Sequence, residues 1–142
     1  MAGVSIGGDN VATAEGGGPR VVDKIYAIMR MVLGFFFFCH GAQKIFGLFG
    51  GPHPDLPVGL VWFAGLSEVI AGSMIAVGFL TTYAAFFSSG LMAFAYFLVH
   101  QGDALLPIEN RGELATVYAW VFLYIAARGD GPWSLGGDDG GY

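Results

Sequence analysis

Ionisable side chains stand inside a long apolar stretch, where burial in lipid makes each of them costly. Arg30, His40 and Lys44 fall within residues 25–49. At 100° per residue these side chains occupy an arc of about 80°, so they share one face of a helix. A second apolar stretch contains Glu68. A buried histidine and carboxylate can exchange protons with a ligand, and a lysine can hold an anionic oxygen.

The depths of these groups predict a shared polar cluster. His40 lies nine residues inside the boundary at Phe49, and Glu68 lies ten residues inside the boundary at Val58. At 1.5 Å per residue both are roughly 13–15 Å deep, on adjacent antiparallel helices. We therefore predict an intramembrane polar cluster made of His40, Lys44, Glu68 and Glu113. Such a cluster favours a small pocket or proton path that serves a quinone headgroup or another protonatable ligand.

A structural network is the alternative interpretation of the same side chains. Lys44 can pair with Glu113, and Glu68 can pair with His40 or Arg30, so that ion pairs hold the helices together without chemistry. Residues assigned to helix packing or ion pairing are Arg30, Gly34, Gly41, Gly72 and Asn110. The single cysteine, Cys39, has no CxxC partner, so no metal site is predicted.

Four apolar segments must position these residues, and they predict an all-α, integral membrane four-helix bundle with flexible Gly-rich termini. The segments are residues 25–49, 58–80, 83–100 and 113–127, with a very short turn at Thr81 and Thr82 between the second and third. Spans of about 20 apolar residues cross a bilayer, and the fourth segment is short by this measure. We divide the chain into a flexible Gly-rich N-terminal tail, a four-helix transmembrane domain and a Gly-rich C-terminal tail, at residues 1–19, 20–128 and 129–142.

Composition favours lipid as the solvent. Hydrophobic residues make up 55% of the chain and charged residues only 12%, against roughly 25% charged in an average soluble domain. With six Lys and Arg in total there is no basic stripe for nucleic acid, so no nucleic-acid partner is expected. The N-terminal residues lack the pattern of a cleavable signal peptide. Basic residues are more frequent at the end that carries both termini, which predicts that both termini are cytoplasmic.

Several motifs in this order resemble the DoxX family of small bacterial and archaeal membrane proteins. The first helix matches the pattern Arg30-x-x-x-Gly34 followed by His40-Gly41-x-x-Lys44, and the second matches Glu68 followed by Gly72 and Gly78. The entry to the fourth helix and the closing segment are similar as well, at Pro107-x-x-Asn110-x-Gly112-Glu113 before Tyr118 and at Gly129-x-Gly131-Pro132-Trp133-Ser134-Leu135. The family usually has an acid after that leucine, where this chain has Gly136.

The resemblance implies a four-helix membrane fold and an association with redox complexes, because the family is named for a subunit of an archaeal thiosulfate:quinone oxidoreductase. We expect a small membrane subunit of an electron-transfer complex in a bacterial or archaeal inner membrane. We expect it to have no cofactor of its own and to contact quinone. Its expected partners are the lipid bilayer and other membrane subunits. The alternative is a non-catalytic accessory subunit that packs against a larger membrane complex. In neither case is the chain expected to be an enzyme by itself. A small transporter is less favoured, because four short helices leave little room for alternating access.

Overall fold

The computed structural model describes residues 19–50 and 56–137, and within these ranges the chain is entirely helical, without strands. The α-helices are α1 (Val21–Phe46), α2 (Val58–Val77), α3 (Thr81–Ala95) and α4 (Glu113–Arg128). A short 3₁₀ turn, η1 (Leu48–Gly50), follows α1, and a π-helical turn, η2 (Tyr96–His100), extends α3. The predicted all-α fold with four helices is therefore confirmed.

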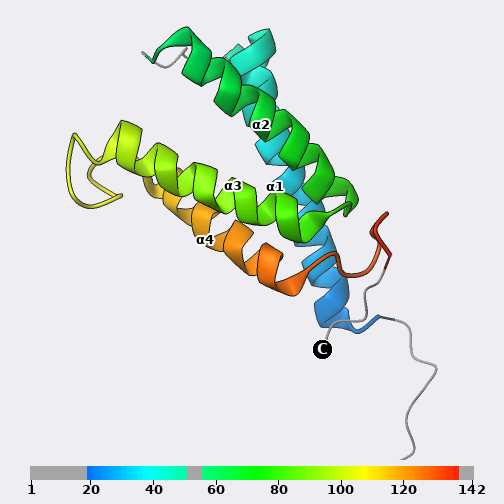
Figure 1. Cartoon of the computed structure of the whole chain (residues 1–142). Helices are drawn as coiled ribbons and strands as arrows, with labels where there is room; N and C mark the ends of the chain where they lie inside the picture. The colour runs from blue at the N-terminus through cyan, green and yellow to red at the C-terminus, as the bar shows by residue number, and fades with distance from the viewer. Residues whose placement is uncertain (1–18, 51–55, 138–142) are drawn as a thin grey trace, which may run out of the picture.

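The helices form two antiparallel pairs rather than an evenly closed bundle. α1 packs along the length of α2, and α3 packs along α4 (Figure 1). The two pairs meet near the end where α1 begins and α4 finishes. They diverge toward the connections that join α1 to α2 and α3 to α4 (Figure 1).

Glycines bring α1 and α2 into backbone contact. A Cβ on Gly34 would lie 2.5 Å from the backbone nitrogen of Ala76, and one on Gly72 would lie 2.5 Å from that of Phe38. About two turns after Gly34 on α1, a Cβ on Gly41 would lie 2.5 Å from the carbonyl oxygen of Gly65. Only hydrogen fits at these positions, and small residues of this kind let helices pack closely in lipid.

The turn between α2 and α3 differs from the prediction. α2 ends at Val77 and is followed by Gly78, which has a left-handed backbone (φ 71°); Leu80 is also left-handed (φ 49°). The predicted turn residues Thr81 and Thr82 are instead the first residues of α3. The backbone N–H of Thr81 donates to Oδ1 of Asp130 at 3.0 Å, so a carboxylate from after α4 caps α3. A distant capping group is invisible to local sequence patterns.

The segment after α4 is packed against the helices, so the expectation of a flexible C-terminal tail is wrong for residues 129–137. The backbone N–H groups of Leu135 and Gly136 donate to the carbonyl oxygens of Val77 and Gly78 at 3.0 and 2.8 Å. These bonds satisfy carbonyls at the C-terminal end of α2 that have no partner within the helix. The remainder of that tail, nearly all of the predicted N-terminal tail, and residues 51–55 lie outside the described residues.

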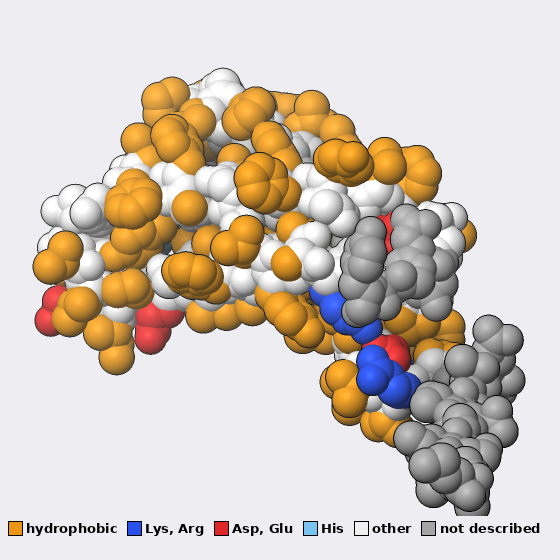
Figure 2. Space-filling view, turned by 60° about the horizontal axis from the view of Figure 1, so that its bottom comes forward, with side chains coloured by type: hydrophobic (Ala, Val, Ile, Leu, Met, Phe, Trp, Pro, Cys, Tyr) orange, Lys and Arg blue, Asp and Glu red, His pale blue; other side chains and the backbone are white. Residues whose placement is uncertain are grey.

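Apolar side chains cover much of the face shown in Figure 2. The buried core is small by comparison. Its most completely buried large side chains are Phe37, Ile75, Phe122 and Ile125, each no more than 1% exposed. Two helical stretches are long and apolar enough to cross a membrane, Val58–Val77 and Thr81–His100. Only 28% and 22% of their apolar windows are buried, so most of this apolar surface faces outward.

Candidate functional site

A pocket of about 470 Å³ lies between the helix pairs where they diverge. All four α-helices contribute to its lining, which is mostly aliphatic and aromatic. The polar side chains in the lining are His40, Gln43 and Lys44 from α1, Glu68 from α2, His100, Arg111 and Tyr118. A mostly apolar pocket of this size with a few polar groups is typical of a small-molecule site.

Lys44 and Glu68 form an ion pair on the wall of this pocket. The Lys44 ammonium lies 2.5 Å from both carboxylate oxygens of Glu68. The Glu68 side chain is only 2% exposed, and that of Lys44 is 26% exposed. The pair joins α1 to α2 beside Gly65, where the absence of a side chain lets the lysine stem pass. A charge buried to this degree needs its partner, because an unpaired one would be strongly unfavourable.

This pairing corrects the ion pairs predicted from the sequence. Glu113, expected beside Lys44, is the exposed first residue of α4 and is not part of the pocket lining. Glu68 pairs with neither His40 nor Arg30. The long lysine side chain reaches inward along the helix, so Lys44 contacts an acid that lies deeper than its own Cα. Depths counted from residue positions along the helices do not include this reach, so they placed Glu68 level with His40 rather than with Lys44.

His40 lines the pocket and faces α4. Its ring lies edge-on to the ring of Tyr118, with centroids 6.0 Å apart and an interplanar angle of 88°. Within the described residues the imidazole makes no hydrogen bond. The structure thus brings His40, Lys44 and Glu68 to one pocket, but the direct partner of His40 is an aromatic side chain from the other helix pair.

Arg30 lies far from this cluster, about 21 Å from Lys44 along the axis of α1. Its guanidinium is completely buried and donates to the carbonyl oxygens of Ile75, at 2.6 Å, and Ala76, at 3.1 Å. It also donates to Trp133 and Pro132, at 3.0 and 3.5 Å. A cation here satisfies the last carbonyls of α2 and complements the helix dipole. Arg30 is therefore a bridge between α2 and the segment after α4.

Asn110 organises the connection between α3 and α4. Its side-chain amide donates to the carbonyl oxygen of Ala104 at 2.9 Å and to the Tyr96 hydroxyl at 3.2 Å, and its oxygen accepts from the N–H of Gly112 at 2.8 Å. The carbonyl of Asn110 lies 3.1 Å from Nδ1 of His100. Asn110 thus shapes the rim of the pocket without being part of its lining.

Sequence reasoning missed Tyr118 and Arg111 as pocket residues. Tyr118 is 6% exposed and stacks on Phe122, with ring centroids 5.2 Å apart. Arg111 has a left-handed backbone (φ 60°), at the entrance to α4. A tyrosine within a short apolar helix was the available signal for Tyr118, because a buried hydroxyl usually needs a partner. The signal for Arg111 was its place beside Asn110, near the same outer boundary as His100.

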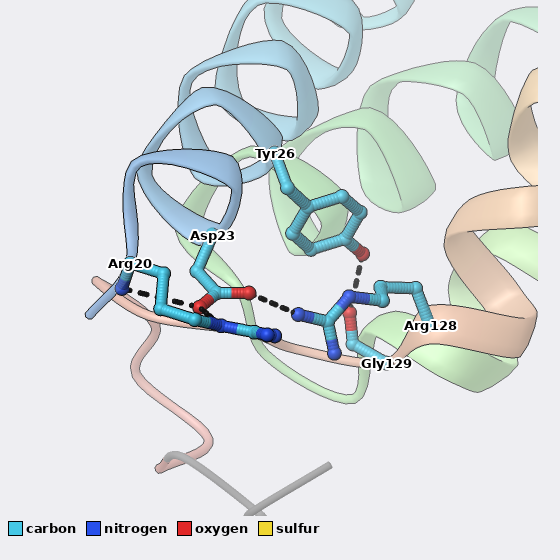
Figure 3. A network of polar contacts seen from close by, with 5 residues as sticks. All are labelled: Arg20, Asp23, Tyr26, Arg128 and Gly129. Carbon is cyan, nitrogen blue, oxygen red and sulfur yellow. Dashed lines mark hydrogen bonds and ion pairs between the residues drawn. The ribbon is translucent and has the colours of Figure 1, made fainter. Parts of the chain in front are cut away.

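A second polar network closes the opposite end of the molecule (Figure 3). The Asp23 carboxylate accepts from Arg128 of α4 at 2.5 Å and from the side chain of Arg20 at 3.1 Å. The Tyr26 hydroxyl donates to the carbonyl oxygen of Gly129 at 2.5 Å, under the Arg128 guanidinium. The side-chain hydrogen bond from Arg20 and the charges of both arginines lower the pKa of Asp23 against the opposing effect of burial. This network ties the start of α1 to the end of α4.

These features describe a small helical protein with two helices apolar enough to cross a membrane and a mostly apolar pocket between two helix pairs. The chain belongs to the DoxX family, whose model matches residues 25–101, so the resemblance inferred from the motifs is confirmed. The match covers α1, α2 and α3, while the motifs before and after α4 lie beyond it. The DoxX family is membrane-associated.

The chain is also similar to an uncharacterized protein of Haemophilus influenzae. The two are 33% identical over 122 residues, which cover 77% of this chain and 86% of the relative. No solved structure matches this chain. Family membership establishes the kind of protein, and its function depends on the residues of the pocket.

Proposed function

We propose that this chain is a membrane-spanning subunit of a quinone-linked redox complex and that the quinone headgroup binds in the pocket between the helix pairs. The observation that carries the proposal is the Lys44–Glu68 ion pair on the wall of a mostly apolar pocket of about 470 Å³. Ionisable side chains that face an apolar cavity in a membrane protein favour proton, ion or ligand binding over simple packing.

The exposure of the apolar helices supports insertion into a bilayer. α2, and α3 together with η2, each provide 20 residues, or about 30 Å of helix, which matches the hydrocarbon thickness. Their apolar windows are only 28% and 22% buried, whereas a core helix of a soluble protein is mostly buried. α1 has 26 residues, about 39 Å, and spans with tilt. α4 has 16 residues, about 24 Å, and Arg128 extends its reach by snorkelling.

The distribution of basic residues supports an orientation with both termini in the cytoplasm of a bacterial or archaeal cell. Arg20, Lys24 and Arg128 lie at the end that carries the termini, and Lys44 and Arg111 lie toward the other end. Positively charged residues are enriched on the cytoplasmic side. The pocket, which lies toward the connections between the helices of each pair, then faces the outer half of the bilayer.

A quinone matches the chemistry of the lining. Its flat ring suits aromatic walls such as Phe37, its isoprenoid tail suits Leu91 and Leu98, and its oxygens need hydrogen-bond donors such as Lys44. Reduction to the quinol takes two electrons and two protons. In this proposal a redox-active partner subunit delivers the electrons, and His40 with the Lys44–Glu68 pair passes the protons to the quinone oxygens.

The closed geometry of the ion pair favours a second candidate, a non-catalytic accessory subunit. Both carboxylate oxygens of Glu68 are occupied by Lys44, as expected for a pair that holds α1 to α2 and does nothing more. In that case the pocket is filled by lipid tails or by a helix of the larger complex.

Isolation of the tagged chain from native membranes in mild detergent tests the proposal. We expect stoichiometric cofactor-bearing subunits, and quinone reduction that falls at least about 10-fold in Glu68→Gln. Glu113→Gln is the matched control, because it makes the same change at an exposed carboxylate outside the pocket. Unchanged quinone reduction in Glu68→Gln would leave the accessory role, and isolation of the chain without partners would contradict both candidates.

A further inference from the structure

The hydroxyl of Tyr118 differs from those of Tyr26, which is buried, and Tyr96, which is half-buried. Tyr26, 4% exposed, donates to a backbone carbonyl oxygen, that of Gly129, and Tyr96 donates to that of Leu105 at 2.9 Å. Tyr118 is 6% exposed, yet its hydroxyl makes no hydrogen bond to any residue in 19–50 or 56–137. Buried hydroxyls are normally paired, so an unpaired one calls for an explanation.

The Tyr118 hydroxyl is not sealed in the core. Among the described residues, two side-chain atoms are both inaccessible and without a hydrogen bond, Nε of Arg30 and Oγ1 of Thr81. The Tyr118 oxygen has no hydrogen bond and is not one of them, so it retains accessible surface. The space that Tyr118 lines is the pocket between the helix pairs. Its ring is held by Phe37, with centroids 5.7 Å apart, and by Phe122, so the packing fixes where the hydroxyl points.

His40 is another polar side chain of the pocket that makes no hydrogen bond to the described residues, as are Gln43 and Arg111, and it stands next to Tyr118. The imidazole comes from α1 and the phenol from α4, so the two groups belong to different helix pairs. Lys44 and Glu68, by contrast, already bond to each other, and both carboxylate oxygens of Glu68 accept from the ammonium. His40 and Tyr118 are therefore neighbouring groups from opposite helix pairs, and both are available to a ligand in the pocket.

We infer that Tyr118 and His40 together bind one carbonyl oxygen of a quinone-type headgroup, so that the ligand bridges the two helix pairs. The inference rests on the proposed function and adds the residues that recognise the headgroup. A phenol O–H and an imidazole N–H are donors suited to a ring carbonyl. The lining around them is mostly apolar, and a low local dielectric strengthens such bonds relative to those at an open surface.

Binding of two matched probes to the full chain in lipid nanodiscs tests the inference. The probes are a benzoquinone with a decyl tail and decylbenzene, which has the same tail and no oxygen. We expect Tyr118→Phe to weaken quinone binding about 2- to 10-fold, the effect of one lost hydrogen bond, and to leave decylbenzene binding unchanged. Tyr118→Phe keeps the ring that packs on Phe37 and Phe122, so the fold should be retained. His40→Phe should show the same selective loss.

Tyr83→Phe is the control, because Tyr83 is 74% exposed and lies outside the pocket. If wild-type protein binds the quinone and Tyr118→Phe leaves the affinity unchanged, this inference is overturned and the proposed function is not. That result would indicate that the hydroxyl holds only water. Equal losses for both probes would also overturn it, since they would indicate altered packing. Wild-type protein that does not bind the quinone would overturn the proposed function as well.

Discussion

The ammonium of Lys44 lies 2.5 Å from both carboxylate oxygens of Glu68, so that a single side chain from α1 neutralises the buried acid of α2. The two residues are 24 positions apart in the sequence and come from antiparallel helices. Because the Glu68 side chain is almost fully buried, neither member of the pair can be removed without a consequence for the other.

Removal of one partner should therefore destabilise the protein more than removal of both. We expect Lys44→Met to lower the free energy of unfolding by on the order of 3 kcal/mol, because it leaves the Glu68 carboxylate buried and unpaired. The double variant Lys44→Met with Glu68→Gln should recover most of that loss. Thermal unfolding in detergent, with the exposed Lys24→Met as control, measures both. A double variant less stable than Lys44→Met would contradict the pairing.

Close contact between α1 and α2 should depend on glycine at specific positions. Gly34→Ala should destabilise the protein by about 1–3 kcal/mol, because its Cβ would overlap the backbone of Ala76 and Gly72. Gly90→Ala in α3 is the matched control, since nothing lies within 4 Å of its added Cβ. It should be neutral or stabilise by about 1 kcal/mol through helix propensity. Chemical unfolding of both variants checks the contrast, and equal effects would argue against the tight α1–α2 contact.

Loss of the Arg30 guanidinium should release the segment after α4. Arg30→Met removes donors to Ile75 and Trp133, so we expect amide hydrogen exchange at Leu135 and Gly136 to rise about 10-fold or more, as their bonds to α2 weaken. Arg30→Lys should show an intermediate effect, because an ammonium cannot reproduce the planar fork. Exchange in α4 serves as the internal reference. Unchanged exchange at Leu135 would mean that its backbone bonds alone hold the segment.

Acid should weaken the network at the start of α1. Asp23 lies before the apolar part of that helix, and its pKa is lowered from the ordinary 3.8, first by the side-chain hydrogen bond from Arg20. A lowered pKa in the folded state means that the unfolded state binds the proton more readily, so stability is present above about pH 4 and is lost as pH falls further. Unfolding of Asp23→Asn measured from pH 6 to pH 2.5 should lack this component. An acid dependence identical to wild type would exclude Asp23 as its source.

Local patterns in the sequence were sufficient for the helices and the family. Runs of apolar residues interrupted by glycine and proline predicted four helices, and the order of the motifs predicted DoxX membership; both are confirmed. Helix ends were less well predicted: α1 begins at Val21, four residues before the expected Ile25, and α3 begins within the expected turn. Apolar runs and breaks are properties of neighbouring residues, so they can be read without knowledge of the fold.

The tertiary structure alone decided which polar groups meet. Arg30, His40 and Lys44 share a face of α1, yet Arg30 binds carbonyls at one end while Lys44 reaches Glu68 near the other. The partner of each group depends on which helix lies opposite, on how far the pairs diverge and on how far a side chain extends. The same holds for residues 129–137. Their glycines predicted a free tail, but in the structure the segment bonds to carbonyls at the end of α2 and to the Arg30 guanidinium. These contacts join residues 24 to 103 positions apart, and no local pattern encodes them.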